Sequence, residues 1–463
     1  MQLALEGDFA RARLLTSNRN GETMLPDLKR TLAVLLAVTV ISPSPAQSLE
    51  EANEATIADA YVYLLGRALV DRQEKSDIAE DGVDYNVIKY NPVGAADFVN
   101  PNLDVAYLEA WIAVDDQSAV LLGVPQVEGR YYTVQICDEW GNVITNINER
   151  NYPLNPFGTF AFVTPDSVAD LPEGAVPIVL PSRKAKMLAR VELQTDWDIA
   201  VALQRKFTMS TVGTPEISAP TDLPLFDNRT LAGVEIFDYA DDLLSEALDT
   251  IPVAPAMQAK VREVARVAAA PAHREALEAT LRNIVVPRFL KFAVTEAGSY
   301  QNNWLGTLVG GIYGDDYWTR TAANLVGIWA NSTHEVIYFI ATRDGDGNPL
   351  DGSNTYVIEF DESDSPGAVV DGYWSVILVD LPDYRVVPNE IDRFNFNSYS
   401  PLDRDEDGGL SIFVAPAESD AFPSANWLPA ADAKPFSLTF RTYVPKDVVK
   451  RGDWFPPSIR KLN

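Results

Sequence analysis

The chain has 463 residues, of which 47% are hydrophobic and 22% charged, the balance of an ordinary folded protein with room for two or three domains. Its 66 acidic residues against 37 basic ones give a net charge of −29, which repels phosphate backbones and anionic lipid heads. The charge therefore excludes a nucleic-acid partner. It leaves cationic partners and divalent ions open, although a solvated acidic surface alone would account for it.

A targeting signal is expected near the N-terminus. Lys29 and Arg30 precede an apolar run, 31–41, and small residues follow it up to Ala46. The run is too short to span a bilayer, and no other segment is long and apolar enough to do so. We expect a secretory signal over about 24–46, preceded by an extension or an overlong gene start, and a periplasmic or secreted mature protein.

Hydrophobic periodicity divides the rest of the chain. A helix is expected at 50–73, where Ala, Tyr and Leu recur at helical spacing. Alternating runs rich in β-branched and aromatic residues predict strands at 106–114, 119–124, 131–137, 143–147, 158–163, 176–180 and 186–193. Thr195-Asp196 can cap a helix that runs through Lys206, and further helices are expected at 231–248, 256–268, 272–286 and 315–331. Strands resume at 335–342, 355–360, 373–380, 410–414 and 437–443.

These runs predict a mainly β protein of the α+β class, because strands and helices do not alternate along the chain. We expect two antiparallel β-sandwich or jelly-roll units with a helical segment interposed. The expected parts are an N-terminal extension and signal, 1–46; a helix and first sandwich, 47–195; a helical middle, 196–331; and a second sandwich, 332–463.

One phrase occurs twice. Residues 129–138 resemble residues 372–380, and in both an aromatic pair opens an alternating apolar run that ends on Asp. The copies differ just before the aromatic pair, where the first has Arg130 and the second has Gly372. We therefore expect the polar site to lie with the first copy and the second copy to be mainly scaffold.

The pattern around the repeated phrase is also shared. From Phe162 to Arg190 is 28 positions, and from Phe413 to Arg441 is again 28. Upstream, each copy has an Asn, a Tyr and a bulky aromatic residue in turn: Asn102, Tyr107 and Trp111 in the first, Asn354, Tyr356 and Phe360 in the second. Matched order of this kind indicates one β unit used twice.

Familiar catalytic motifs are absent from the sequence. It has no Gly-rich phosphate loop, nucleophile elbow or paired-His zinc motif, and with two His in all a Ser-His-Asp triad is not expected. The single Cys, Cys137, stands in an apolar strand run and is expected to be a buried hydrophobe rather than a nucleophile.

One acidic loop resembles a calcium site. Asp403, Asp405 and Asp407, followed by Gly408, match the first six positions of a calcium loop, but Val414 stands where the bidentate acid is expected. Because Asp and Gly are also standard hairpin residues, a turn without metal is the simpler interpretation. Calcium, the one cofactor that the sequence suggests, stays open.

Polar residues embedded among aromatic ones form the more informative set. Asp104, Tyr107 and Arg130 could act as acid or base, proton relay and anion anchor. Six others would line a binding pocket: Asn102, Tyr131, Trp374, Arg393, Trp427 and Arg441. The alternative is a structural network in which buried Arg and acidic side chains pair and hold the strands together.

At these residues the chain resembles two bacterial domain-of-unknown-function families, 1254 in its first half and 1214 in its second. The first resemblance is carried by Asn102-x-Asp104-x-x-Tyr107, Val124-Pro125 and Gly129-Arg130-Tyr131-Tyr132. The second is carried by 350–356, Tyr373-Trp374-Ser375, Asn426-Trp427-Leu428-Pro429-Ala430, Arg441-x-Tyr443-x-Pro445-Lys446 and Pro456-Pro457. The resemblance implies tandem β-sandwiches with jelly-roll character and interposed helices, often exported, and it brings no reaction with it.

Three functions remain for the structure to weigh. The first is an exported protein that binds a small polar molecule or a carbohydrate in an aromatic, Arg-lined pocket. The second is a hydrolase or lyase that works without His, through carboxylate, Tyr and Arg. The third is a structural or assembly module whose sheet edges pair to form a homo-oligomer. The sequence leaves open whether the protein is an enzyme and which ligand it takes.

Overall fold

The computed structural model describes residues 45–94, 100–431 and 433–462. Its contacts divide the chain into Met1–Ala55 and Thr56–Asn463, and the features below lie in the second unit. Residues 24–44 of the expected export signal lie outside the described residues. Within the described ranges, no helix has the length and apolarity needed to cross a membrane.

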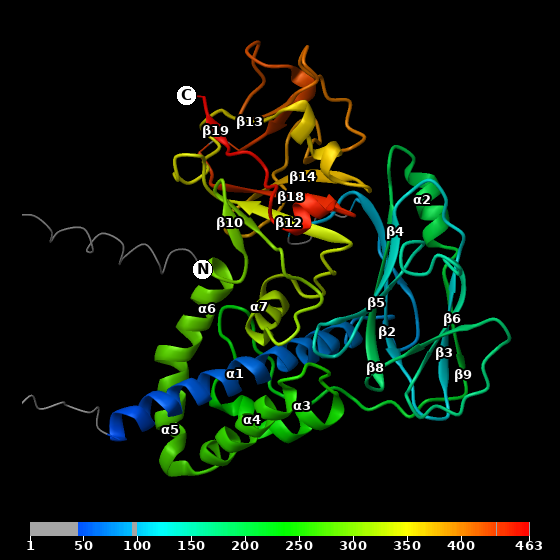
Figure 1. Cartoon of the computed structure of the whole chain (residues 1–463), viewed down its shortest axis with the longest axis vertical. Helices are drawn as coiled ribbons and strands as arrows, with labels where there is room; N and C mark the ends of the chain where they lie inside the picture. Colours follow the sequence, from blue (N-terminus) through cyan, green and yellow to red (C-terminus); the bar gives the residue numbers. More distant parts are fainter. Residues whose placement is uncertain (1–44, 95–99, 432, 463) are drawn as a thin grey trace, which may run out of the picture. The chain divides into compact units, whose positions relative to one another are not determined.

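The first β-sandwich is made of two sheets (Figure 1). One sheet has the order β1 (Lys89–Tyr90), β2 (Val105–Ala113), β8 (Lys184–Glu192), β4 (Tyr132–Cys137) and β5 (Val143–Ile147). The other has the order β7 (Val176–Val179), β6 (Gly158–Val163), β3 (Ala119–Val124) and β9 (Thr208–Val212). Apolar side chains from both sheets form one core, as alternation along each strand requires.

The second β-sandwich repeats this construction (Figure 1). One sheet has the order β10 (Ser299–Gln301), β11 (Trp304–Gly306), β12 (Val336–Ala341), β18 (Phe436–Tyr443), β14 (Trp374–Asp380) and β15 (Asn395–Asn397). The other has the order β17 (Trp427–Pro429), β16 (Leu410–Ala415), β13 (Tyr356–Phe360) and β19 (Arg460–Lys461). Side chains of both sheets again share one core, which buries Trp304, Trp374 and Phe440.

The strand order of the two sandwiches is the same. The order β2-β8-β4-β5 corresponds to β12-β18-β14-β15, and β7-β6-β3-β9 corresponds to β17-β16-β13-β19. The one parallel pair of the first sandwich, β6 with β7, also recurs as β16 with β17. The repeated phrase falls on β4 and β14, so the strand order repeats as that phrase predicts.

The upstream part of the expected repeat follows a different alignment. Tyr107 lies on β2, whereas Tyr356 lies on β13, which takes the place of β3 rather than β2. The counterpart of β2 is β12, and the sequence pattern missed this because the two Asn-Tyr-aromatic runs agree only in composition.

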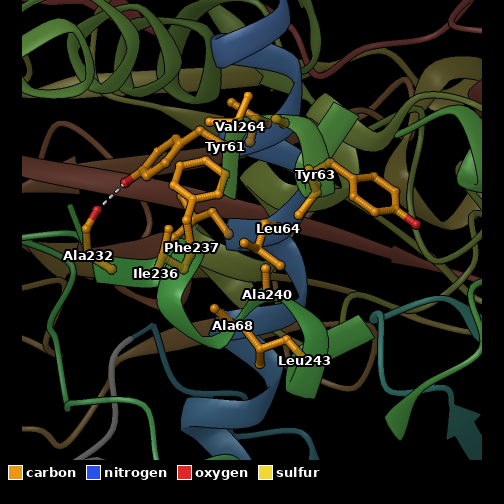
Figure 2. Close-up of a cluster of buried hydrophobic side chains, with 14 of the residues drawn as sticks. Tyr61, Tyr63, Leu64, Ala68, Ala232, Ile236, Phe237, Ala240, Leu243 and Val264 are labelled. Atoms are coloured by element: carbon orange, nitrogen blue, oxygen red, sulfur yellow. Dashed lines mark hydrogen bonds between the residues drawn. The ribbon is translucent and has the colours of Figure 1, made fainter. Parts of the chain in front are cut away.

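Helices form the third part of the second unit. From Ile57 onward, helix α1 (Pro45–Ile78) packs against the 3₁₀ helix η2 (Val234–Tyr239) and the helices α3 (Ala240–Glu246), α4 (Ala254–Ala268), α5 (Pro271–Thr280), α6 (Val286–Thr295) and α7 (Tyr317–Gly327). A π-helical turn, η3 (Leu281–Val285), joins α5 to α6. Figure 2 shows Leu64 and Phe237 in this core, with the Tyr61 hydroxyl donating to the Ala232 carbonyl at 2.6 Å.

Short strands are the elements that the sequence pattern missed. β9, β10 and β11 lie inside the stretch 196–331 that was expected to be helical, and β15, β17 and β19 have three residues or fewer. β9 carries mostly polar residues and is a strand because it pairs with β3. Helix α2 (Trp197–Gln204) begins where expected, since the Asp196 side chain accepts from the Ile199 backbone N–H.

Candidate functional site

Equivalent residues of the two sandwiches meet in one aromatic cluster. It contains Tyr131 at the start of the first repeated phrase and Tyr373 at the start of the second, whose ring centroids lie 5.7 Å apart. Tyr443 lies 5.4 Å from Tyr131 and stacks on Tyr373 at 4.0 Å. The duplicated units therefore contact each other through matching surfaces, as in a symmetric dimer.

Strand register fixes which positions correspond. Arg190 on β8 lies opposite Tyr107, and Arg441 on β18 lies opposite Tyr338. Each guanidinium also stands over its Tyr ring, at 5.3 and 5.8 Å from the centroid. Counting along these strands, the residue before β2, Asp104, corresponds to the residue before β12, which is Glu335.

The two carboxylates occupy the same backbone position in each half. The Asp104 carbonyl accepts from the Leu193 N–H and the Glu335 carbonyl from the Val444 N–H, both at 2.8 Å. Both side chains are buried, with 4% and 1% of their surface exposed. They differ in what surrounds the carboxylate, and that difference defines the site.

Glu335 is fully bonded. Its Oε2 accepts from the Tyr131 hydroxyl at 2.9 Å and from the Arg150 Nη2 at 2.7 Å. Its Oε1 accepts from the Asn148 Nδ2 at 2.9 Å and from the Arg150 Nε at 3.3 Å. A buried carboxylate held by a guanidinium and two neutral donors is a structural ion pair.

Asp104 is only half bonded. Its Oδ1 accepts from the Nδ2 atoms of Asn395 and Asn397 at 2.8 and 2.9 Å. Its Oδ2 has no hydrogen-bond partner among the described residues, and neither has the buried Tyr373 hydroxyl, the counterpart of the Tyr131 hydroxyl. Asp is one methylene shorter than Glu, so the bond that joins Tyr131 to Glu335 is not made between Tyr373 and Asp104.

The guanidinium of Arg150 also has no counterpart at Asp104. Asn148 and Asn397 each begin a turn of the same kind. In both turns the Asn Oδ1 accepts a hydrogen bond from the backbone N–H of the residue two positions later, at 3.0 and 2.9 Å. That later residue is Arg150 in the first half and Tyr399 in the second. Where the first half places a cation, the second half places an aromatic ring.

A cavity of about 290 Å³ lies at the Asp104 position. Its described lining has acidic side chains, amides and aromatic rings: Asp104, Glu192, Asp392, Gln194, Asn395, Asn397, Trp197, Tyr373, Phe394 and Tyr399, with Gly94, Leu103 and Leu193. No Lys or Arg belongs to this described lining, and residues 95–99, which follow Gly94, lie outside the described part of the chain.

Two carboxyl groups of the lining have a pKa above the ordinary value. Burial raises the pKa of Asp104, and Asn397, Ser375 and the Arg441 guanidinium oppose that rise. Burial likewise raises the pKa of Glu192, although its Oε2 accepts from the Tyr131 backbone N–H at 2.8 Å.

Family comparisons match the two halves separately. A model described as "Protein of unknown function (DUF1254)" matches residues 85–211, which hold the first sandwich. A model described as "Protein of unknown function (DUF1214)" matches residues 335–447 in the second. The chain is a tandem DUF1254–DUF1214 protein. The cavity takes Asp104 and Glu192 from the DUF1254 domain and its Tyr and Asn side chains from the DUF1214 domain.

One solved structure supports the same fold, and a second aligns with the chain more weakly. The crystal structure of the VPA0106 protein from Vibrio parahaemolyticus is similar over 89% of this chain and all of that one, with a TM-score of 0.63 and 19% identity. An uncharacterized protein from Burkholderia cenocepacia aligns over 92% of each chain with a TM-score of 0.42 and 13% identity. No curated protein matches the chain.

Of the three residues predicted to be catalytic, Asp104 alone lines the cavity. Tyr107 lies under the Arg190 guanidinium, inside the contact between the two domains. Arg130 donates from Nη1 to the backbone carbonyls of Glu192 and Leu193, at 2.8 and 3.4 Å. Arg130 therefore binds the backbone at the end of β8, next to Glu192, and does not line the cavity.

The six residues predicted to bind ligand lie in the domain contact, in a core or in hydrogen bonds to backbone carbonyls. Asn102 donates from Nδ2 to the Tyr443 hydroxyl at 2.5 Å, and Tyr131 bonds Glu335 as described. Trp374 stacks on Phe440 at 5.6 Å in the core of the DUF1214 domain. None of the six belongs to the cavity lining.

The remaining three of those six bond backbone carbonyls. Arg393 donates from Nη1 to Ser424 and Trp427 at 2.7 and 2.8 Å, and the Trp427 indole donates to the Ala415 carbonyl at 3.0 Å. Arg441 donates from Nη2 to the carbonyls of Asn100 and Pro101 at 3.0 and 3.1 Å. The network interpretation describes these residues, and the cavity is lined by carboxylates rather than by Arg.

The acidic loop forms a turn. The Asp405 N–H donates to the Gly409 carbonyl at 3.1 Å, the Gly408 N–H donates back to the Asp405 carbonyl at 2.9 Å, and Gly408 has φ +81°. Within the described ranges no group of three His, Cys, Asp or Glu side chains is arranged to hold a metal, so Asp403, Asp405 and Asp407 do not form such a group.

Sequence reasoning missed most of the cavity, and one signal could have found it. Glu192, Asn395, Asn397 and Tyr399 were not singled out. An Asn-x-Asn pair occurs on β5 and the residue after it, at 146–148, and again on β15, at 395–397. Extending the repeat to this pair would have placed Arg150 opposite Tyr399. The site was expected with the first copy, but its lining comes from both domains.

Proposed function

We propose that the protein binds a small polar molecule in the cavity between its two domains. The observation that carries the proposal is a set of polar atoms without partners around one cavity. Asp104 Oδ2, Glu192 Oε1 and the Tyr373 hydroxyl are buried and accept or donate no hydrogen bond among the described residues. Buried polar groups are nearly always bonded, so each of these needs an explanation, and a bound ligand supplies one.

The walls of the cavity suit such a ligand. Trp197, Phe394 and Tyr399 offer aromatic surface, and the amides of Asn395 and Asn397 fix one carboxylate oxygen of Asp104. Apolar walls with a few convergent polar groups are typical of small-molecule sites. At about 290 Å³ the space is at the lower end of such sites, so a ligand of monosaccharide size or smaller is expected.

A purely structural module explains one half of the contact but not the other. The ion pair of Glu335 with Arg150 is a complete structural network. At Asp104 the same backbone position has lost the guanidinium and one hydroxyl bond, which costs stability and adds no contact. Binding is the function that offsets this loss.

A second candidate is acid–base catalysis in the same cavity. Asp104 and Glu192 both line it, and burial raises the pKa of each, the direction that favours use of a carboxyl group as a general acid. A hydrolase or lyase of this kind would require the two carboxyl groups and Tyr373, which line the same cavity. Turnover of esters, glycosides and phosphoesters by the wild type, lost in Asp104→Asn and in Glu192→Gln, would establish it.

The binding proposal is tested by a ligand screen with matched variants. Native mass spectrometry of the purified protein looks for a retained small molecule, and thermal shift assays screen saccharides, polyols, amino acids and amines. We expect a ligand whose affinity falls at least tenfold in Tyr373→Phe. Tyr300→Phe, on the exposed strand β10, is the control and should bind as the wild type does.

Two results would sink the proposal. One is a folded wild type that retains no ligand and responds to no compound of the screen. The other is a ligand that binds Tyr373→Phe and Asp104→Asn as well as the wild type, because the binding would then lie outside the cavity.

We also propose that the protein is exported and that its sandwiches have jelly-roll character. The support for export is the basic-then-apolar run that ends in small residues at Ala46. Expression of the full chain in a Gram-negative host, followed by N-terminal sequencing of the periplasmic fraction, should give a chain that begins at Gln47. Recovery of the uncut chain in the cytoplasm would contradict it.

A further inference from the structure

The Glu335 side of the molecule shows what fits beside this arrangement of carboxylate, Asn and Tyr. There the occupant is the guanidinium of Arg150, which bonds Glu335 twice and stands 5.1 Å from the Tyr131 ring centroid. At the Asp104 position the carboxylate, the Asn and the Tyr are retained as Asp104, Asn397 and Tyr373, and the guanidinium is absent. The cavity lies at the retained groups.

We propose that the ligand of this cavity is an organic cation, a guanidinium or primary ammonium compound, held by Asp104 and Glu192. It takes the role that the Arg150 guanidinium has at Glu335. This inference rests on the proposed binding function and names its ligand class.

Charge around the cavity favours a cation. Its described lining carries three acidic side chains, Asp104, Glu192 and Asp392, and no basic one. Two guanidinium groups act from behind the lining: Arg441 on Asp104 and Arg130 on Glu192. Both are held by backbone carbonyls, so neither closes the open oxygens.

The unpartnered atoms are acceptors matched to a cationic donor. Asp104 Oδ2 and Glu192 Oε1 are acceptors that a guanidinium or ammonium group can bond through N–H, with charge assistance. Trp197, Tyr373 and Tyr399 also line the cavity, and aromatic rings attract a cation. A net charge of −29 on the whole chain also steers cations toward the protein.

An anionic ligand is disfavoured by the same geometry. The Nε and Nη1 atoms of Arg441 have no hydrogen-bond partner among the residues that the structure describes, but Arg441 does not line the cavity. An anion in the cavity would meet three acidic side chains before it met a guanidinium, and like charges in a partly buried site repel strongly.

The test compares two probes of the same shape and different charge. Methylguanidinium and methylurea are both planar and differ mainly in that the first carries a positive charge. Isothermal titration calorimetry at pH 7.5 should show methylguanidinium binding at least tenfold more tightly than methylurea. In Asp104→Asn this preference should fall at least tenfold, while Asp407→Asn, which removes an exposed charge in the acidic turn, should bind within twofold of the wild type.

A filling variant tests the position of the cation. Tyr399→Arg places a guanidinium where the first half has Arg150, and it should abolish methylguanidinium binding while the protein stays folded. Arg150→Ala removes the guanidinium that Glu335 binds, so methylguanidinium should take its place and raise the Tm of this variant. This rise in Tm is the positive control, because it shows that the concentration of methylguanidinium is high enough.

The outcomes separate this inference from the binding proposal. If methylguanidinium raises the Tm of Arg150→Ala but does not bind the wild type, or binds no better than methylurea, the cation assignment is overturned. If a neutral saccharide then binds in a manner sensitive to Tyr373→Phe, the cavity remains a binding site for a neutral molecule. If no compound of either kind binds, both proposals fail.

Discussion

The Glu335 side and the Asp104 side of the domain contact share one backbone arrangement but differ in how the buried carboxylate is bonded. Both place a buried carboxylate beside an Asn amide and a Tyr hydroxyl at equivalent backbone positions. On the Glu335 side, a longer acid and Arg150 close the network. On the Asp104 side, a shorter acid and Tyr399 leave unpartnered oxygens and a cavity. Two changes in a duplicated contact are enough to separate a structural joint from a candidate site.

The comparison also shows why burial alone does not identify a functional carboxylate. Glu335 is as buried as Asp104, yet all of its bonding capacity is used. A bonded buried charge stabilises the contact it belongs to, and an unpartnered one costs free energy in the empty protein.

The largest effect is expected from neutralising the two carboxylates in parallel. Glu335→Gln removes the charge that Arg150 pairs with and should lower the free energy of unfolding by about 3 kcal/mol, as breaking a buried ion pair does. Asp104→Asn keeps an acceptor for Asn395 and Asn397 and should cost less than about 1 kcal/mol. Urea denaturation of both variants measures the difference.

Equal losses in the two variants would contradict the comparison, because they would mean that Asp104 is as fully bonded as Glu335. Asp407→Asn, in the exposed acidic turn, controls for the change in net charge and should be within about 0.5 kcal/mol of the wild type.

A smaller effect is expected at the two tyrosines. Tyr131→Phe removes a hydroxyl that donates to a carboxylate at 2.9 Å and should cost about 2 kcal/mol. Tyr373→Phe removes a hydroxyl that has no hydrogen-bond partner in the part of the chain that the structure describes, so its stability should match or exceed that of the wild type. Thermal and urea unfolding of the pair decide this, and a loss of more than about 1 kcal/mol in Tyr373→Phe would show that its hydroxyl is bonded after all.

Sequence periodicity predicted the long strands because their pattern reflects burial on one face. β3, β5 and β6 begin and end at the predicted residues, and the fold class follows from these strands. β15 was missed because it has three residues and is a strand only through pairing with β14. Local pattern cannot reveal an element that exists through its neighbour.

The candidate site was harder to predict for a related reason. Asp104 was found because an acidic residue before a strand stands out among aromatic residues. Glu192 was not, because its side chain becomes part of a cavity only when β15 and Tyr399 of the other domain lie beside it. Arg441 was correctly seen as unusual in a strand, but it bonds backbone carbonyls and stands over the Tyr338 ring rather than facing the cavity.

A guanidinium added at the Asp104 side should stabilise the protein, whereas the substitutions at Glu335 and Tyr131 destabilise it. Tyr399→Arg supplies a guanidinium near Asp104 and should raise the free energy of unfolding by about 1 kcal/mol. Tyr399→Lys is the matched control, since it brings the charge without the planar fork, and its gain should be smaller. Destabilisation by both variants would show that the Asp104 side cannot accept the side chain that the Glu335 side holds.

The smallest effect is expected from pH, and it concerns Asp104 itself. Burial raises the pKa of this carboxyl above its value in the unfolded chain, so the folded protein holds its proton more tightly than the unfolded one. The stability that this gives is complete below the unfolded pKa of about 3.9 and is lost as pH rises through the folded pKa. The Tm of the wild type should therefore fall relative to that of Asp104→Asn as pH is raised from 4 to 7.

The difference in Tm between the two proteins is used because it cancels the contribution of the other acidic residues, whose repulsion also grows with pH. A difference that stays flat, or that rises with pH, would mean that the open oxygen of Asp104 already has a partner, and the contrast with Glu335 would then disappear.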